Sequence, residues 1–186
     1  MTLWIILGIV VVLGGYVISI YNGLVKNRQL VQEGWSGIDV QLKRRTDLIP
    51  NLMEAVKGYM SHERETLQAV TDARVNAQSA ANASPEERAK AEGALSGALG
   101  RLIAVAEAYP DLKASTNFLE FQQALQTTEE EIQLARRYYN GAVRNLNTTV
   151  ESFPSNLVAN NFKFEKAEYF ELEDPADRAV PTVKFN

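Results

Sequence analysis

Residues 118–153 read FLEFQQALQTTEEEIQLARRYYNGAVRNLNTTVESF. Apolar and small residues recur here at alternating spacings of three and four, which is the period of one face of an α-helix. The members of this face are Phe118, Phe121, Leu125, Thr128, Ile132, Ala135, Tyr139, Ala142, Leu146, Thr149 and Phe153. Large members alternate with small ones, which favours packing inside a bundle over a two-stranded coiled coil. We therefore predict one long helix that ends at Pro154, since proline cannot continue the hydrogen-bond ladder.

A second helical face lies nearer the N-terminus. Its members are Val31, Trp35, Ile38, Leu42, Arg45, Ile49, Leu52, Val56 and Tyr59, after which the pattern shifts phase to Met60, Leu67 and Val70. We predict another long helix here, kinked modestly at Pro50 because proline cannot donate to the carbonyl of Thr46.

A third helix begins at a capping box. Ser84 can cap the helix, Pro85 suits its first position, and Glu87 can bond back to the capping residue. The apolar face consists of Leu95, Leu99, Leu102, Ala106 and Tyr109, and Pro110 ends the helix.

Three glycines stand inside this third helix, at positions 93, 97 and 100. Each would cost about 1 kcal/mol relative to alanine, so they indicate close backbone approach to a neighbour. The connections at residues 78–84 and 110–116 are short, and short connections force antiparallel neighbours. The three long helices therefore pack up, down and up.

No charged side chain occurs in the first 25 residues, and residues 3–20 read LWIILGIVVVLGGYVISI. Roughly 20 apolar residues suffice to cross a bilayer core about 30 Å thick. A cleaved signal peptide would need a basic start, a shorter apolar core and a small-residue cleavage site, and the sequence has none of these. We therefore predict an uncleaved membrane anchor that continues outward as a helical stalk.

The predicted fold is all-α: an N-terminal transmembrane helix continues into an antiparallel up-down bundle of three long helices plus a short fourth, with an extended C-terminal tail. The predicted parts are the anchor, residues 1–25, the bundle domain, residues 26–170, and the acidic tail, residues 171–186. The short fourth helix covers residues 156–160 and is capped by Ser155.

Basic residues close to the span all lie on its C-terminal side. They are Lys26, Arg28, Lys43, Arg44 and Arg45. The positive-inside rule therefore places the short N-terminus outside and the bundle in the cytoplasm. A periplasmic bundle is the alternative, because the absence of cysteine fits either compartment.

Motifs spread along the chain resemble the bacterial LemA family. They are Trp35-Ser36, residues 38–45 (IDVQLKRR), 47–52 (DLIPNL) and 56–59 (VKGY), His62-Glu63, Ala73-Arg74, residues 106–114 (AEAYPDLKA), Arg136, Tyr139-Asn140, Asn145 and Phe153-Pro154. The resemblance covers nearly the whole chain. It implies a single-pass protein of the bacterial inner membrane with a short outward N-terminus and a helical bundle, and it supplies no biochemical activity.

The sequence carries no convergent catalytic pattern. His62-Glu63 begins a zinc-protease motif, but Thr66 stands where the second histidine would be, and the chain has one histidine. Consecutive carboxylates at 129–131 diverge by about 100° per residue around a helix and cannot meet at one ion. We predict no catalytic residue, metal or cofactor.

A net charge of −4 and a pI of about 5.2 argue against nucleic-acid binding.

Arg45 is the charged residue on the second apolar face. One option is that its stem is buried with the guanidinium in water, and another is that the guanidinium pairs across the bundle with Asp39, Asp47 or an acid of the third helix. Recognition of a partner's carboxylate or phosphate is the third option. We hypothesise that a protein-binding surface is formed by Lys43, Arg44, Arg45, Asp47 and Asn51.

These features predict a non-enzymatic scaffold or adaptor that recruits a membrane or peripheral protein. The predicted partners are membrane lipid, through the N-terminal helix, and an unidentified protein. A self-assembling structural membrane protein that forms a large homo-oligomer is the first alternative, and an enzyme of unrecognised type is the second.

Overall fold

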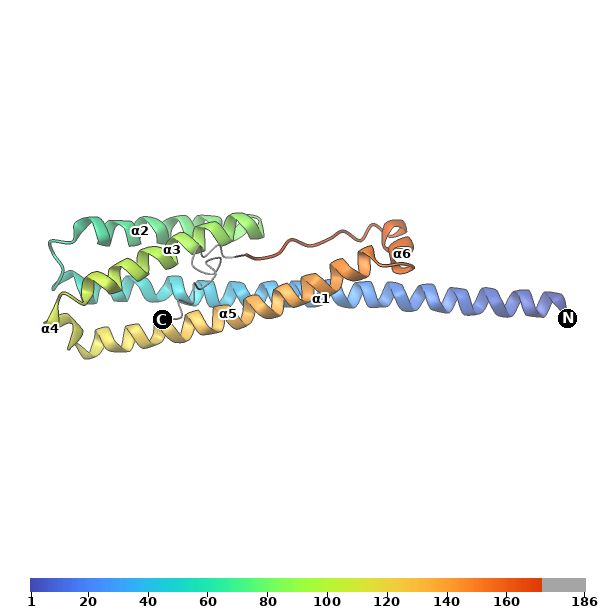
Figure 1. The fold of residues 1–186 in the computed structure, drawn as a ribbon, viewed down its shortest axis with the longest axis horizontal. Coiled ribbons are helices and arrows are strands. Elements are labelled where there is room, and N and C mark those ends of the chain that lie inside the picture. The colour runs from blue at the N-terminus through green and yellow to red at the C-terminus, as the bar shows by residue number, and fades with distance from the viewer. Residues whose placement is uncertain (172–186) are drawn as a thin grey trace, which may run out of the picture. The chain divides into compact units, whose positions relative to one another are not determined.

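The computed structural model describes residues 1–171, which form helices and connecting segments without a strand. The elements are α1 (Thr2–Lys57), α2 (Arg64–Ser79), the 3-10 helix η1 (Ala80–Asn82), α3 (Pro85–Ala106), α4 (Pro110–Lys113), α5 (Thr116–Glu151) and α6 (Ser155–Asn161). Figure 1 shows their course. The all-α prediction is confirmed. The predicted acidic tail lies, apart from Glu171, outside the described residues.

Helix α1 runs without interruption from the apolar N-terminal segment to Lys57, so the predicted stalk is continuous with the span. The apolar pattern that we assigned to a single helix ending near Val70 belongs to two helices. After α1 the amides of Tyr59 and Met60 both donate to the carbonyl of Val56, and the chain turns before α2 begins. The apolar pattern in the sequence shifts its helical phase between Tyr59 and Met60, at the same place as this break.

The described chain forms two compact units, each with its own apolar core. The first contains Met1–Ile38 and Leu134–Tyr169, and the second contains Asp39–Gln133 together with Phe170 and Glu171, the last described residues. Helices α1 and α5 therefore each contribute residues to both units.

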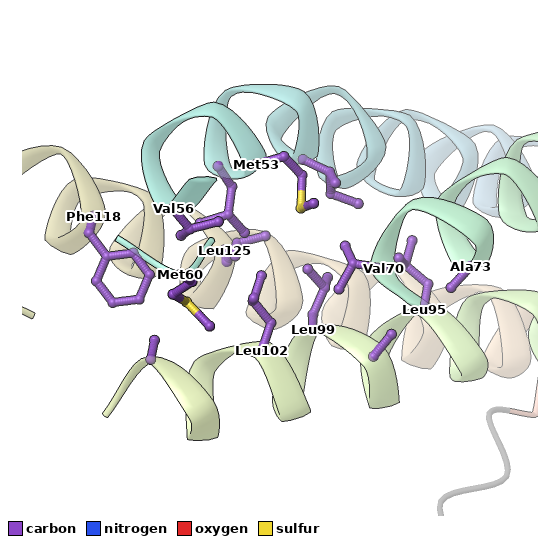
Figure 2. Packing of buried hydrophobic residues seen from close by; sticks show 14 of the residues in the cluster. Met53, Val56, Met60, Val70, Ala73, Leu95, Leu99, Leu102, Phe118 and Leu125 are labelled. Atoms are coloured by element: carbon purple, nitrogen blue, oxygen red, sulfur yellow. The ribbon is translucent and has the colours of Figure 1, made fainter. Parts of the chain in front are cut away.

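The second unit is a bundle in which α1, α2, α3 and the first part of α5 surround one core. Its buried apolar residues are Ile49, Leu52, Met53, Val56, Met60, Val70, Ala73, Ala77, Leu95, Ala98, Leu99, Leu102, Ala106, Leu112, Phe118 and Leu125. Figure 2 shows side chains from these helices converging, among them Val56, Val70 and Leu99. Fully burying a side chain of this size contributes about 1.5–3 kcal/mol, so this cluster is the main stabilising element of the unit.

The predicted start of α3 is confirmed, but the reason given for its glycines is wrong at two positions. Ser84 accepts from the amide of Glu87, whose carboxylate accepts from the amide of Ser84. A Cβ at Gly97 or Gly100 would meet nothing within 4 Å. Both glycines face solvent, so no close helix packing requires them.

The core of the first unit joins α1, the last turns of α5, and α6. It consists of Leu24, Leu146, Val158, Ala159 and Phe164. After α6 the chain returns along α5, where the side chain of Asn147 makes hydrogen bonds of 2.9 and 2.8 Å to the carbonyl and amide of Ala167. The Tyr139 hydroxyl donates to the carbonyl of Glu168 at 2.8 Å. These bonds fix the returning segment on α5.

Two sequence expectations fail at the junction of α5 and α6. Ser155 does not cap α6, because its hydroxyl donates back to the carbonyl of Ser152 at 2.9 Å. Phe153, the last member of the predicted buried face, is 80% exposed. Helix α5 ends at Glu151, so the helical period no longer determines where the Phe153 side chain points.

Candidate functional site

A buried ionic network occupies the middle of the second unit. The Arg45 side chain is 0% exposed, and its guanidinium donates to Glu92 at 2.5 Å, to Ser96 at 2.6 Å and to Glu129. The residues come from α1, α3 and α5. The pairing of Arg45 with an acid of the third helix is therefore confirmed, whereas a guanidinium in water, and pairing with Asp39 or Asp47, are wrong. A paired guanidinium inside the bundle holds three helices in register.

A second charged pair lies on the same helices. Arg88, 3% exposed, donates to Asp39 at 2.5 Å and to the carbonyl of Ala81 at 3.1 Å. Asp39 thus binds Arg88 of α3. This pair fixes the first turn of α3 against α1 and the preceding 3-10 turn.

The carbonyl of Thr46, which Pro50 leaves without its usual helical donor, has a different partner. The Nε of Arg74, on α2, donates to this oxygen at 3.2 Å. Buried backbone carbonyls are costly without a donor, so Arg74 compensates for the proline. The α1 segment that carries the predicted surface is consequently held by side chains from α2, α3 and α5.

The exposed side of this segment carries a polar strip, which we call the α1 stripe: Lys43, Asp47, Asn51 and Glu54. Spacings of four, four and three place these residues on one face of the helix. Lys43 binds Asp47 at 2.6 Å, with both side chains more than half exposed. An exposed pair of this kind contributes little stability, so its charges are available to another molecule.

Next to the α1 stripe lies a groove between α1 and α5 of about 670 Å³. Its lining residues are Leu48, Asn51, Glu54, Ala55, Asn117, Glu120, Phe121 and Ala124. We call it the α1–α5 groove. Leu48 and Phe121 are half-buried, whereas the two carboxylates, of Glu54 and Glu120, are exposed. Glu54 binds Lys57 at 2.5 Å, so the groove offers apolar contact together with the carboxylate of Glu120 and a lysine-paired carboxylate.

The structure separates the five residues of the predicted surface. Asn51 lines the groove, while Lys43, Arg44 and Asp47 are exposed outside its lining. Arg45 is inside the bundle and cannot contact a partner while its present bonds persist. Glu120 and Phe121 also line the groove but are not among the residues predicted for this surface. Phe121 belongs to the apolar face of the long helical pattern, and Glu120 is its polar neighbour in the sequence.

A sequence profile of the LemA family matches residues 34–185. The chain belongs to the LemA family. It is similar to "Protein LemA" of Metamycoplasma hominis, with 29% identity over 155 residues that cover 82% of this chain and 69% of the relative.

This LemA-family chain is also similar to two proteins of magnetic bacteria. It is 26% identical to "Magnetosome protein MamQ 2" of Paramagnetospirillum magneticum and 23% identical to "Magnetosome protein MamQ" of Magnetospirillum gryphiswaldense. Each alignment covers 87% of this chain and 68% of the relative. The names of these relatives state no catalytic activity.

The structure also shows where the discarded metal motif of the LemA-family chain lies. His62 is exposed, and Glu63 accepts a hydrogen bond of 2.8 Å from the Tyr109 hydroxyl. This bond to a carboxylate raises the pKa of Tyr109. Within residues 1–171, no group of three or more His, Cys, Asp or Glu is placed to hold a metal ion.

Proposed function

We propose that this chain is a membrane-anchored scaffold that recruits a membrane or peripheral protein through the α1–α5 groove and the adjoining α1 stripe. The observation that carries the proposal is the groove, with a partly apolar lining and exposed carboxylates, on a helix that the Arg45 network holds against α3 and α5. A partner fits this surface if it presents an apolar side chain beside a lysine or arginine.

The first half of α1 supports the anchoring part of the proposal. Its most apolar window has a mean hydropathy of 2.6, and none of it is buried by the protein. Large exposed apolar surfaces on a soluble monomer are rare, whereas a helix of this length and composition can cross a bilayer. Lipid is therefore the expected environment of this segment.

The experiment uses the full-length chain carrying a photo-crosslinking amino acid at Asn51, expressed at native level. Val75, which is 51% exposed on α2, is the matched control position. We expect one protein to crosslink from position 51 and not from position 75, and the crosslink to be lost after Glu54→Lys together with Glu120→Lys. Equal crosslinking from both positions, or none from position 51, would contradict the proposed surface.

Light scattering of the protein in mild detergent distinguishes the scaffold from the first alternative, a self-assembling structural membrane protein. A complex with a stoichiometric second protein supports recruitment. A large, homogeneous particle containing this chain alone supports self-assembly, which would make the groove a contact between copies.

A further inference from the structure

The corner between α5 and α6 exposes three large apolar side chains. Phe153 is 80% exposed, Leu157 61% and Phe162 50%. We call these three residues the apolar corner. Val158 and Ala159 of α6 are buried in the core of the first unit. Leu157 of α6 is exposed, so this short helix carries apolar side chains on its outer side as well as on its inner side.

The apolar corner is fixed beside the end of the membrane span. The Tyr21 ring lies 4.9 Å from the ring of Phe162 and 5.6 Å from that of Phe164, both in edge-to-face arrangements. Ile20, the last residue of the apolar run, packs against the cluster that includes Val158 and Phe164. Figure 1 shows α6 alongside α1. All these residues belong to the first unit.

The length of the span determines the depth in the bilayer at which the apolar corner lies. At about 1.5 Å per residue, residues 3–20 extend about 27 Å, close to the thickness of a bilayer core of roughly 30 Å. Ile20 and Tyr21 therefore lie where the hydrocarbon ends. Side chains that contact Tyr21 lie at the same depth, within the interfacial layer in which aromatic rings are favoured.

Basic residues surround this level. Lys26 and Arg28 follow the span on α1, and the Arg28 guanidinium lies 5.1 Å from the centre of the Phe164 ring. Lys163 is exposed next to Phe162, while Lys166 is paired with Glu151 at 2.8 Å. Cations beside apolar side chains suit the anionic headgroups of a membrane surface.

We infer that the apolar corner inserts into the interfacial layer of the bilayer that α1 crosses and forms a second, monotopic lipid contact. The inference rests on the anchoring part of the proposed function. Insertion removes three large apolar side chains from water and fixes the orientation of the first unit at the membrane surface, which a single helix alone would leave free to rotate and tilt.

The absence of cysteine makes a depth measurement direct. Single cysteines replace Phe153 or Leu157 in the full-length chain, and each carries a nitroxide spin label in nanodiscs of phosphatidylethanolamine and phosphatidylglycerol. Relaxation by oxygen, which partitions into lipid, is compared with relaxation by a water-soluble nickel chelate. Leu13 is the control inside the span. Leu134, 53% exposed on α5 and about 25 Å along the helix from its end at Glu151, is the matched exposed control.

The expected result is lipid-like accessibility at positions 13, 153 and 157 and water-like accessibility at position 134. Lipid-like accessibility at 13 with water-like accessibility at 153 and 157 overturns the inference and leaves the anchor intact. Water-like accessibility at 13 overturns the anchor itself. Lipid-like accessibility at position 134, in addition to positions 13, 153 and 157, overturns the inference about the apolar corner. The label or the whole helix, rather than the corner, would then account for the signal.

Discussion

At the scale of single residues, Arg45 shows how a charge can belong to an apolar helix face. Burying a guanidinium and its carboxylate partners costs solvation free energy, which their mutual attraction and hydrogen bonds repay only when the geometry is complete. Here Glu92 and Ser96 come from α3 and Glu129 from α5, so the geometry exists only in the assembled bundle. The network is consequently better evidence for a specific helix register than for extra stability.

Removal of one member of this network is expected to be far more harmful than removal of two. Arg45→Met should lower the free energy of unfolding by about 3–5 kcal/mol, because Glu92 is left buried without a counter-charge. Adding Glu92→Met should restore much of this loss. Thermal unfolding in detergent, followed by circular dichroism, measures both. Lys43→Met, which breaks only an exposed pair, should cost less than about 1 kcal/mol, and an equal loss there would contradict the argument.

The buried hydroxyl of Tyr139 should make the stability of the folded protein depend on pH in the alkaline range. Burial raises the pKa of this hydroxyl from the ordinary tyrosine value of 10.0 to about 12. The unfolded chain therefore loses this proton first as the pH rises, and the contribution to stability is present below pH 10 and is lost between pH 10 and about 12. Tyr139→Phe should flatten the pH dependence of the unfolding midpoint in this interval. Parallel curves for the two proteins would contradict this assignment.

At the scale of elements, α1 combines an apolar half that is long enough to cross a membrane with a half held by charged side chains. Proline inside the helix would ordinarily leave a carbonyl without a donor, and Arg74 of α2 supplies one. The tolerance of Pro50 is therefore a property of two helices together.

A double-mutant cycle tests this link. Arg74→Ala should lower the free energy of unfolding by about 1–3 kcal/mol, because the carbonyl of Thr46 loses its donor. In a Pro50→Ala background the backbone amide of residue 50 can bond to that carbonyl, so the same substitution should cost clearly less. Equal costs in both backgrounds, measured by thermal unfolding, would show that Arg74 acts through other contacts.

Two glycines with different surroundings offer a matched comparison. A Cβ at Gly34 would lie 3.0 Å from the Cα of Tyr139, so Gly34→Ala should destabilise the first unit by about 1–2 kcal/mol. Gly97→Ala meets open space and should stabilise α3 by up to about 1 kcal/mol through helix propensity. The unfolding midpoints of the two variants should shift in opposite directions, and shifts of the same sign would refute the assignment.

At the scale of the whole molecule, residues 1–171 contain one helix that is long and apolar enough to cross a membrane, and two compact units built partly from that helix. The continuity of α1 means that the span and the bundle share one backbone without a linker. The basic residues that follow the span predict a cytoplasmic bundle.

Cysteine labelling in bacterial spheroplasts tests this orientation. A single cysteine replacing Ser61, which is exposed between α1 and α2, should react with a membrane-impermeant maleimide only after the membrane is opened. Thr2→Cys, at the other end of the span, should react in intact spheroplasts. The reverse pattern would place the bundle in the periplasm.

The sequence alone determined the helical class, the apolar span, the capping box of α3 and most of α5 short of its C-terminal end, because each depends on local periodicity or on neighbouring residues. It also singled out Arg45 and Pro50. Tertiary structure decided the rest: the partners of Arg45, the donor for Thr46, the groove that joins Asn51 to Glu120, and the side chains exposed at the apolar corner. These features bring together residues far apart in the chain, and helical periodicity specifies the face of a residue but not the neighbour that the face meets.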